Sequence, residues 1–130
     1  MRNDIQAALK QVVTGDEPGK IEAEFRFDDK HEFFAGHFPG RPLLPGIFHI
    51  GMVREAVAAA TGVQYDIVRV AKAKFTDEVR PGETVRLQAT LTEEEPPRVR
   101  ATLFNSRGPA AKVSLVLRVR GPRPLPADSA

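Results

Sequence analysis

Hydrophobic and polar residues alternate along several short segments of the chain, which is the pattern of half-buried β-strands. In residues 20–27 the apolar side chains fall on every second position and the charged ones fall between them. The same alternation recurs in residues 84–91, 98–104 and 112–120, and residues 66–75 form a further predicted strand. Glycine, proline and asparagine gather at residues 14–20, 80–83 and 105–109, where we expect turns.

Two segments have helical periodicity instead. Residues 47–62 are rich in alanine and have apolar residues on nearly all faces of a helix, which predicts a buried helix. Gly62 is expected to end this helix. Near the N-terminus, Ile5, Ala8, Leu9 and Val12 share one face of a short helix that Asn3 or Asp4 would cap. The simplest packing is an α+β domain in which one curved antiparallel sheet wraps around the central helix.

Composition narrows the class of protein. A length of 130 residues predicts a single domain over residues 1–130, with a core at about 20–120 and a proline-rich, unpaired tail at about 121–130. A net charge of +2 is too weak to indicate nucleic-acid binding, and the absence of cysteine excludes disulfides and thiol chemistry. No apolar run is long enough for a membrane span, and the first residues lack a signal core, so we expect a cytoplasmic protein.

The segment HFPGRPLLPG (37–46) contains the first candidate for chemistry. Prolines fix φ around His37, and a rigidly held histidine beside a helix start suits a general base. Alternatively, His37 fills a loop and bonds a carbonyl group. Gly46 is expected to open the helix, where its N–H could hold an oxygen that becomes negative, or it is a plain turn glycine.

The predicted central helix contains three further candidates. His49 is expected to be a core histidine with a bonded nitrogen. Glu55 lies one turn after Gly51 on the same face, and a carboxylate on an apolar helix is costly unless it is paired or functional. Arg54 beside it marks a solvent-facing edge in the alternative reading. We find no phosphate-binding glycine loop and no clustered metal site.

The segments FFAGHFPGRPLLPGIFHIGM and AKAKFTDEVRPGETVRLQATL together resemble the β-hydroxyacyl-acyl-carrier-protein dehydratase family. The resemblance covers about residues 20–120 and implies a hot-dog fold, pairing of subunits as a homodimer or heterodimer, and active sites at the subunit interface. It implies that His37 takes the proton alpha to a thioester and that the Gly46 N–H binds the thioester carbonyl. Phe38, Pro45 and Gly51 are then expected to line the substrate pocket.

The resemblance also implies a substrate carried on the phosphopantetheine arm of an acyl carrier protein or on coenzyme A, with no metal or redox cofactor. An acidic carrier would need a basic surface, for which Arg41, Arg69, Lys72 and Lys74 are candidates by charge. The implied activity is that of a dehydratase, a lyase, in fatty acid, polyketide or related lipid synthesis.

Position 51 departs from the family pattern. The family places a carboxylate there, from the partner subunit, to help the β-hydroxyl leave, but this chain has Gly51. Glu55 could replace that acid as a catalytic residue, or a related subunit could supply it in a mixed dimer. Gly51 could instead leave room for a water in an acyl-thioesterase, or the chain could be a non-catalytic acyl-binding subunit.

Overall fold

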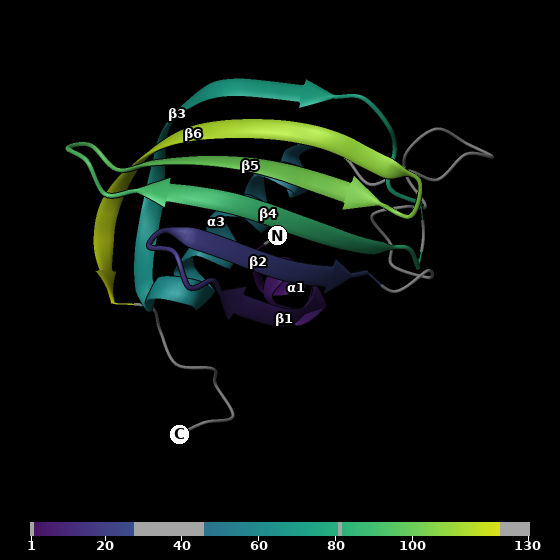
Figure 1. Cartoon of the computed structure of the whole chain (residues 1–130), viewed down its shortest axis with the longest axis horizontal. Coiled ribbons are helices and arrows are strands. Elements are labelled where there is room, and N and C mark those ends of the chain that lie inside the picture. Colours follow the sequence, from purple (N-terminus) through teal and green to yellow (C-terminus); the bar gives the residue numbers. More distant parts are fainter. Residues whose placement is uncertain (1, 28–45, 81, 123–130) are drawn as a thin grey trace.

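The computed structural model describes residues 2–27, 46–80 and 82–122, and its main feature is a six-stranded antiparallel sheet curved around a helix (Figure 1). In the sheet the strands lie in the order β1-β2-β4-β5-β6-β3. Their bounds are β1 Leu9–Thr14, β2 Lys20–Arg26, β3 Val63–Phe75, β4 Thr84–Thr92, β5 Arg98–Asn105 and β6 Gly108–Pro122. The helices are α1 (Arg2–Ala8) and α3 (Gly46–Thr61). This arrangement is the predicted hot-dog fold.

The inner face of the sheet carries the apolar half of each alternating strand. In β4, for example, Val85, Leu87, Ala89 and Leu91 are buried while Thr84, Arg86 and Gln88 are exposed. The antiparallel register aligns these residues with the buried positions of β2 and β5, so one continuous apolar surface faces α3. Burial of this surface is the main favourable term in the folding of such a sheet.

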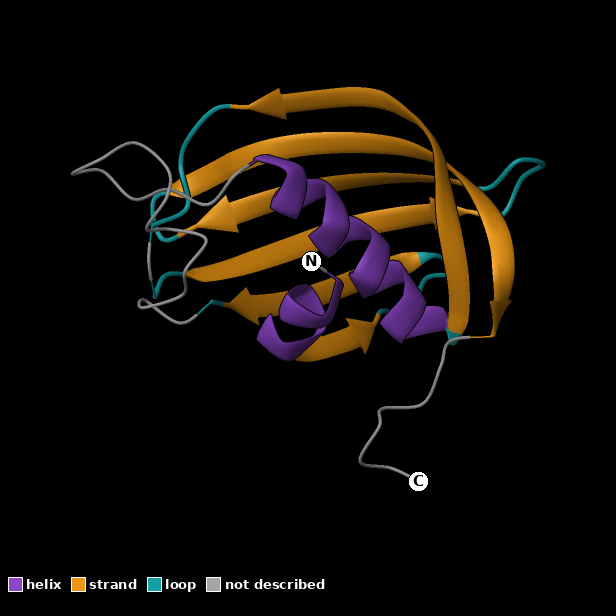
Figure 2. Cartoon of the chain, turned by 180° about the vertical axis from the view of Figure 1, so that it is seen from behind, coloured by secondary structure: helices purple, strands orange, loops and turns teal. Residues whose placement is uncertain are grey.

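Helix α3 crosses the concave face of the sheet (Figure 2). Nine of its 16 residues are buried, which confirms the buried helix that was predicted from apolar residues on nearly all of its faces. It ends where predicted, because Gly62 takes a left-handed φ of 73° and donates its N–H to the Ala58 carbonyl at 2.9 Å. None of the helices among residues 2–27, 46–80 and 82–122 has the length and apolarity needed to cross a bilayer.

The N-terminal segment differs from its prediction. Helix α1 begins at Arg2, before either predicted cap, and stops at Ala8. Leu9–Thr14 then forms an edge strand paired with β2, so the helical spacing of Leu9 and Val12 was misleading. A helix this short is marginal by itself, and the free edge of β2 offers a ladder of backbone hydrogen bonds to the residues that follow it.

The other end of the fold also departs slightly from expectation. The tail was predicted to be unpaired from residue 121, but Gly121 and Pro122 pair with Gln64 and Val63 at the start of β3. The predicted turns at 80–83 and 105–109 are present, since the Glu83 N–H donates to the Arg80 carbonyl and Asn105 pairs with Gly108. That residues 1–130 form a single domain stays a prediction.

Candidate active site

The start of α3 is closely packed against the end of β3. Gly46 is the first residue of the helix, and a Cβ added to it would lie 3.0–3.4 Å from atoms of the Phe75 ring. Glycine therefore suits this position because an aromatic ring lies against it. The first N–H groups of a helix lack intrahelical acceptors and lie at the positive end of its dipole. Gly46 is thus placed where a backbone N–H can bind an oxygen that gains negative charge.

Gly51 lies under the N-terminal helix. A Cβ added to Gly51 would come within 2.4 Å of Ile5 Cδ1, so the Ile5 side chain fills the place that a side chain at 51 would need. Both residues are buried. The space that was expected beside Gly51 for a water is therefore taken by Ile5. Gly51 permits the close contact between α3 and α1.

Glu55, one turn further along α3, is 1% exposed and lies under the same helix. Gln6 Nε2 of α1 donates a hydrogen bond to Glu55 Oε2 at 3.1 Å. Arg54 Nε lies 3.8 Å from Glu55 Oε1, and the Arg54 side chain is only 19% exposed, so it does not mark the solvent-facing edge considered from the sequence. A carboxylate this buried needs such partners, and the sequence predicted that it would be paired or functional.

His49 is buried, as predicted, with 3% of its surface exposed. Its ring meets Phe75 edge to face, with centroids 5.4 Å apart and planes inclined by 64°. Phe75 therefore contacts both Gly46 and His49. The end of β3 thus covers the first turn of the central helix.

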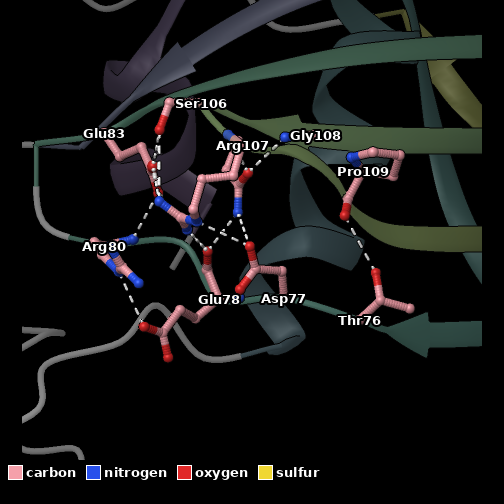
Figure 3. A network of polar contacts seen from close by, with 10 residues as sticks. Thr76, Asp77, Glu78, Arg80, Glu83, Ser106, Arg107, Gly108 and Pro109 are labelled. Carbon is pink, nitrogen blue, oxygen red and sulfur yellow. Dashed lines mark hydrogen bonds and ion pairs between the residues drawn. The ribbon is translucent and has the colours of Figure 1, made fainter.

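A polar network holds this end of β3 in place (Figure 3). The N–H groups of Thr76 and Asp77 both donate to the Ala110 carbonyl of β6. Arg107, in the β5–β6 turn, donates to Asp77 at 3.0 Å, to Glu83 at 2.8 Å and to the Glu78 carbonyl at 2.9 Å. The network joins the segment that directly follows Phe75 in the chain to the neighbouring hairpin.

Asp77 is the most strongly perturbed carboxyl group of this network. Hydrogen bonds from the Asn105 side chain, the Glu78 N–H and Arg107 lower its pKa from 3.8 to about 2. Each donor favours the charged form of the carboxylate. Asp77 is therefore a structural anion near the site and has no proton to give at neutral pH.

The structure describes only some of the predicted site residues. His37, Phe38, Pro45 and Arg41 lie outside the described residues. Gly46, Gly51 and Glu55 lie along α3, and α1 covers the last two. In the described part of the chain, no three His, Asp or Glu side chains are grouped closely enough to hold a metal ion.

Sequence reasoning missed Phe75, Ile5 and the Arg107 network. Hydrogen bonds join Asp77, Glu78 and Glu83 to the side chains of Asn105, Ser106 and Arg107 across the same end of the sheet. The register of the predicted strands could have brought these two turns together, because they lie at the same ends of antiparallel strands. No local pattern could have shown that Ile5 meets Gly51.

Comparisons with known proteins agree with this geometry. A sequence model of the family described as ApeI-like, ApeI dehydratase, matches residues 13–114. The 3-hydroxyacyl-[acyl-carrier-protein] dehydratase FabZ of Chlamydia trachomatis is 39% identical over 73 residues, which are 46% of this chain and 45% of the relative. FabZ of Oenococcus oeni is 35% identical over 88 residues, or 62% of this chain and 61% of that relative. The chain thus spans about half the length of these curated relatives.

A solved structure shows the same fold. The dehydratase heterocomplex ApeI:P from Xenorhabdus doucetiae superposes with a TM-score of 0.66 at 23% identity, covering 84% of this chain and 95% of the other. The likeness extends over nearly the whole of that neighbour and supports the strand order and central helix described above.

Proposed function

The chain belongs to the ApeI-like family of dehydratases, and from this membership we propose that it removes water from a β-hydroxyacyl thioester. The observation that carries the proposal is the family match over residues 13–114, which contains the segment from His37 to Glu55. The position of Gly46 at the start of α3 supports it. The activity would serve fatty acid, polyketide or related lipid synthesis.

The proposed reaction needs a base, an oxygen-binding group and an acid. His37 takes the proton from the carbon alpha to the thioester, and that electron pair forms the α–β double bond as the β carbon–oxygen bond breaks. The Gly46 N–H binds the thioester oxygen, where negative charge gathers. The leaving hydroxyl takes a proton and departs as water. Phe38, Pro45 and Gly51 are the proposed substrate-lining residues.

Two groups could supply that last proton. Glu55 is the carboxyl group of this chain nearest to Gly51 along α3, but it lies under α1 and accepts a hydrogen bond from Gln6. In the second arrangement, a related hot-dog subunit supplies a carboxylate from its own helix. The ApeI:P structure is a dehydratase heterocomplex, which supports this second arrangement.

The proposal extends to substrate carrier and assembly. The acyl chain is carried on the phosphopantetheine arm of an acyl carrier protein, or on coenzyme A, and the reaction itself uses no metal or redox cofactor. The subunit pairs with itself or with a related subunit. A cytoplasmic location, expected from the sequence, stays a prediction.

The test is to incubate the purified protein with a β-hydroxybutyryl thioester of N-acetylcysteamine and to identify the products by mass. A dehydratase forms the enoyl thioester, whereas a thioesterase releases the free acid and the thiol. His37→Ala should abolish turnover while leaving the fold and oligomer unchanged. If Glu55 is the acid, Glu55→Gln should lower kcat by about 10²–10⁴. Glu22→Gln, on the exposed face of β2, is the matched control.

The mixed-dimer arrangement makes a different prediction for the same assay. The protein alone should then be nearly inactive, and co-expression with a related chain that has a carboxylate at the position of Gly51 should restore dehydration. Release of free acid without enoyl product would overturn the dehydratase proposal. Full activity of both the protein alone and Glu55→Gln would exclude both sources of the acid.

A further inference from the structure

The end of β3 receives little support from side-chain packing. Among the described strands, β3 lies at an edge of the sheet and pairs only with β6. Its residues 68–75 are all exposed in the chain. Strand ends with few buried contacts are the parts of a fold that open most easily. Phe75, the last residue of β3, therefore needs support from outside the apolar core.

The place of Phe75 matters because its ring lies against the first turn of α3. Three ring atoms lie 3.0–3.4 Å from the position that a Cβ of Gly46 would take, and the ring meets His49 edge to face. The ring takes room that water would otherwise occupy beside Gly46, and a hydrogen bond is stronger where water is excluded. A shift of Phe75 would therefore change the surroundings of the Gly46 N–H.

The residues that follow Phe75 are held by the Arg107 network, which comprises Asp77, Glu78, Glu83, Asn105 and Arg107. The Arg107 guanidinium donates to three oxygens at once, namely Asp77 Oδ2 at 3.0 Å, Glu83 Oε2 at 2.8 Å and the Glu78 carbonyl at 2.9 Å (Figure 3). Such a set of contacts uses the planar fork of donors that distinguishes arginine from lysine. Asp77 is two residues after Phe75, so the network fixes the chain directly beyond the ring.

Asn105 ties the network to the interior of the sheet. It is buried at the end of the inner strand β5, and its Nδ2 group donates to Asp77 at 2.8 Å and to the Glu78 carbonyl at 2.9 Å. Its Oδ1 accepts a hydrogen bond from the Arg107 backbone N–H at 2.8 Å. An isolated surface ion pair holds a chain weakly, whereas several charges in one network hold it better. The network thus fixes the segment after β3 to an inner strand.

We propose that Arg107 and Asp77 are positioning residues for the dehydration, because they fix the end of β3 and so hold the Phe75 ring against Gly46. The ring in turn keeps the Gly46 N–H in place while negative charge gathers on the thioester oxygen. This inference rests on the proposed dehydratase function. It adds two residues from turns at the end of the sheet, and both act through Phe75 without contact with the substrate.

The first test is the steady-state kinetics of Arg107→Ala with the β-hydroxybutyryl thioester of N-acetylcysteamine. The charge on the thioester oxygen develops in the transition state, so kcat should fall about 10- to 100-fold while KM stays within about twofold. Asp77→Asn removes one charge at unchanged size and should lower kcat by less. This milder variant replaces Arg107→Ala in the test if the alanine variant does not fold.

A double-mutant cycle shows whether Arg107 acts through Phe75. Phe75→Leu removes the ring but keeps an apolar side chain, and it should itself lower kcat. In that background Arg107→Ala should lower kcat by less than about twofold more, because the ring that it positions is already absent.

Amide hydrogen exchange of residues 46–53, the first two turns of α3, gives a measurement that does not depend on activity. Exchange there should become at least about threefold faster in Arg107→Ala and in Phe75→Leu, because the start of the helix opens more often without the ring. Exchange of residues 56–61, at the other end of α3, should not change.

Arg118→Ala is the matched control. Arg118 is an exposed arginine that pairs with Asp66 at 3.3 Å near the start of β3, far along the strand from Phe75. Its loss removes an ion pair of the same kind and should change neither kcat nor the exchange of residues 46–53. Because β3 is an edge strand, light scattering should also show the same mass for every variant.

The original kcat in folded Arg107→Ala would contradict the positioning role, and so would effects of Arg107→Ala and Phe75→Leu that simply multiply. A change of mass would do the same, since the network would then serve subunit assembly. If the original protein dehydrates no thioester, the dehydratase proposal fails, and the exchange of residues 46–53 alone decides whether the network holds the start of α3.

Discussion

At the scale of the residue, Gly51 shows why a departure from a family pattern must be examined together with its neighbours. From the sequence, the missing side chain indicated a lost acid or room for a water. The structure shows that Ile5 occupies this position, from a helix 46 residues earlier in the chain. The alternating strands and the Gly62 cap follow from local patterns, but a contact between distant residues does not.

This contact leads to a stability prediction. Gly51→Ala should destabilise the protein by about 1–3 kcal/mol through overpacking against Ile5, although alanine improves helix propensity by about 1 kcal/mol. Ile5→Val removes the Cδ1 methyl that the new Cβ would meet and should cost about 0.5–1.5 kcal/mol alone. Urea unfolding of both single variants and the double variant measures the coupling.

The double variant, which combines Gly51→Ala with Ile5→Val, tests whether the two positions are coupled. It should be more stable than the sum of the two single changes predicts, because the shortened side chain leaves room for the alanine methyl. Strict additivity would show that Ile5 does not limit the size of residue 51. The same cycle with Gly51→Glu then tests whether a restored carboxylate needs the shorter residue at position 5.

At the scale of the element, the segment after β3 and the β5–β6 turn act as one unit through Arg107 and Asp77. The sequence indicated each turn separately, and alternation indicated the later strands, although β3 begins at Val63 where 66 was predicted and β6 covers Gly108–Pro122 where 112–120 was predicted. It did not indicate β1, since Leu9 and Val12 also fit a helix. That segment is a strand because it pairs with β2. Pairing with another strand cannot be recognised from the local spacing of apolar residues.

The network predicts a pH dependence for unfolding. Hydrogen bonding lowers the pKa of Asp77 from 3.8 to about 2 in the folded protein, so its charge contributes stability that is present above the unfolded pKa. This stability is lost progressively between about pH 5 and about pH 1, as the pH falls through the folded pKa. Asp77→Asn should therefore unfold with a weaker pH dependence in this range, as measured by urea titrations between pH 2 and pH 6.

Other carboxylates also titrate in this pH range. The test therefore compares the slope of the free energy of unfolding against pH in Asp77→Asn with the slope in the original protein. Asp16→Asn changes an exposed aspartate in the β1–β2 loop and should leave the slope as it is in the original protein. Equal slopes for Asp77→Asn and the original protein would show that the hydrogen bonds to Asp77 do not stabilise its charged form.

At the scale of the whole molecule, β3 forms an edge of the sheet and carries exposed apolar side chains. Val68 and Val70 are 56% and 43% exposed, and an open apolar edge is a site for pairing with another strand. We expect a dimer or higher assembly formed through this edge. Light scattering of the protein at micromolar concentration should give at least twice the mass of the chain.

Val70→Asp should shift that assembly towards the monomer, because a buried unpaired charge at a subunit contact is costly. Val13→Asp, on the opposite edge strand β1, is the matched control for a half-exposed valine and should leave the mass unchanged. A stable monomer of the original protein at that concentration would contradict the prediction.

The two hairpin turns at the ends of β5 lie at opposite ends of the sheet (Figure 1). Ser106 and Arg107 in one turn are tied to Glu83, while Glu93, Glu94 and Glu95 in the other are exposed. An epitope or a small reporter domain inserted among these glutamates would leave the Arg107 network and the start of α3 intact. The same insertion at Ser106 would separate Arg107 from its carboxylates, so the molecule can be labelled at one end of its sheet only.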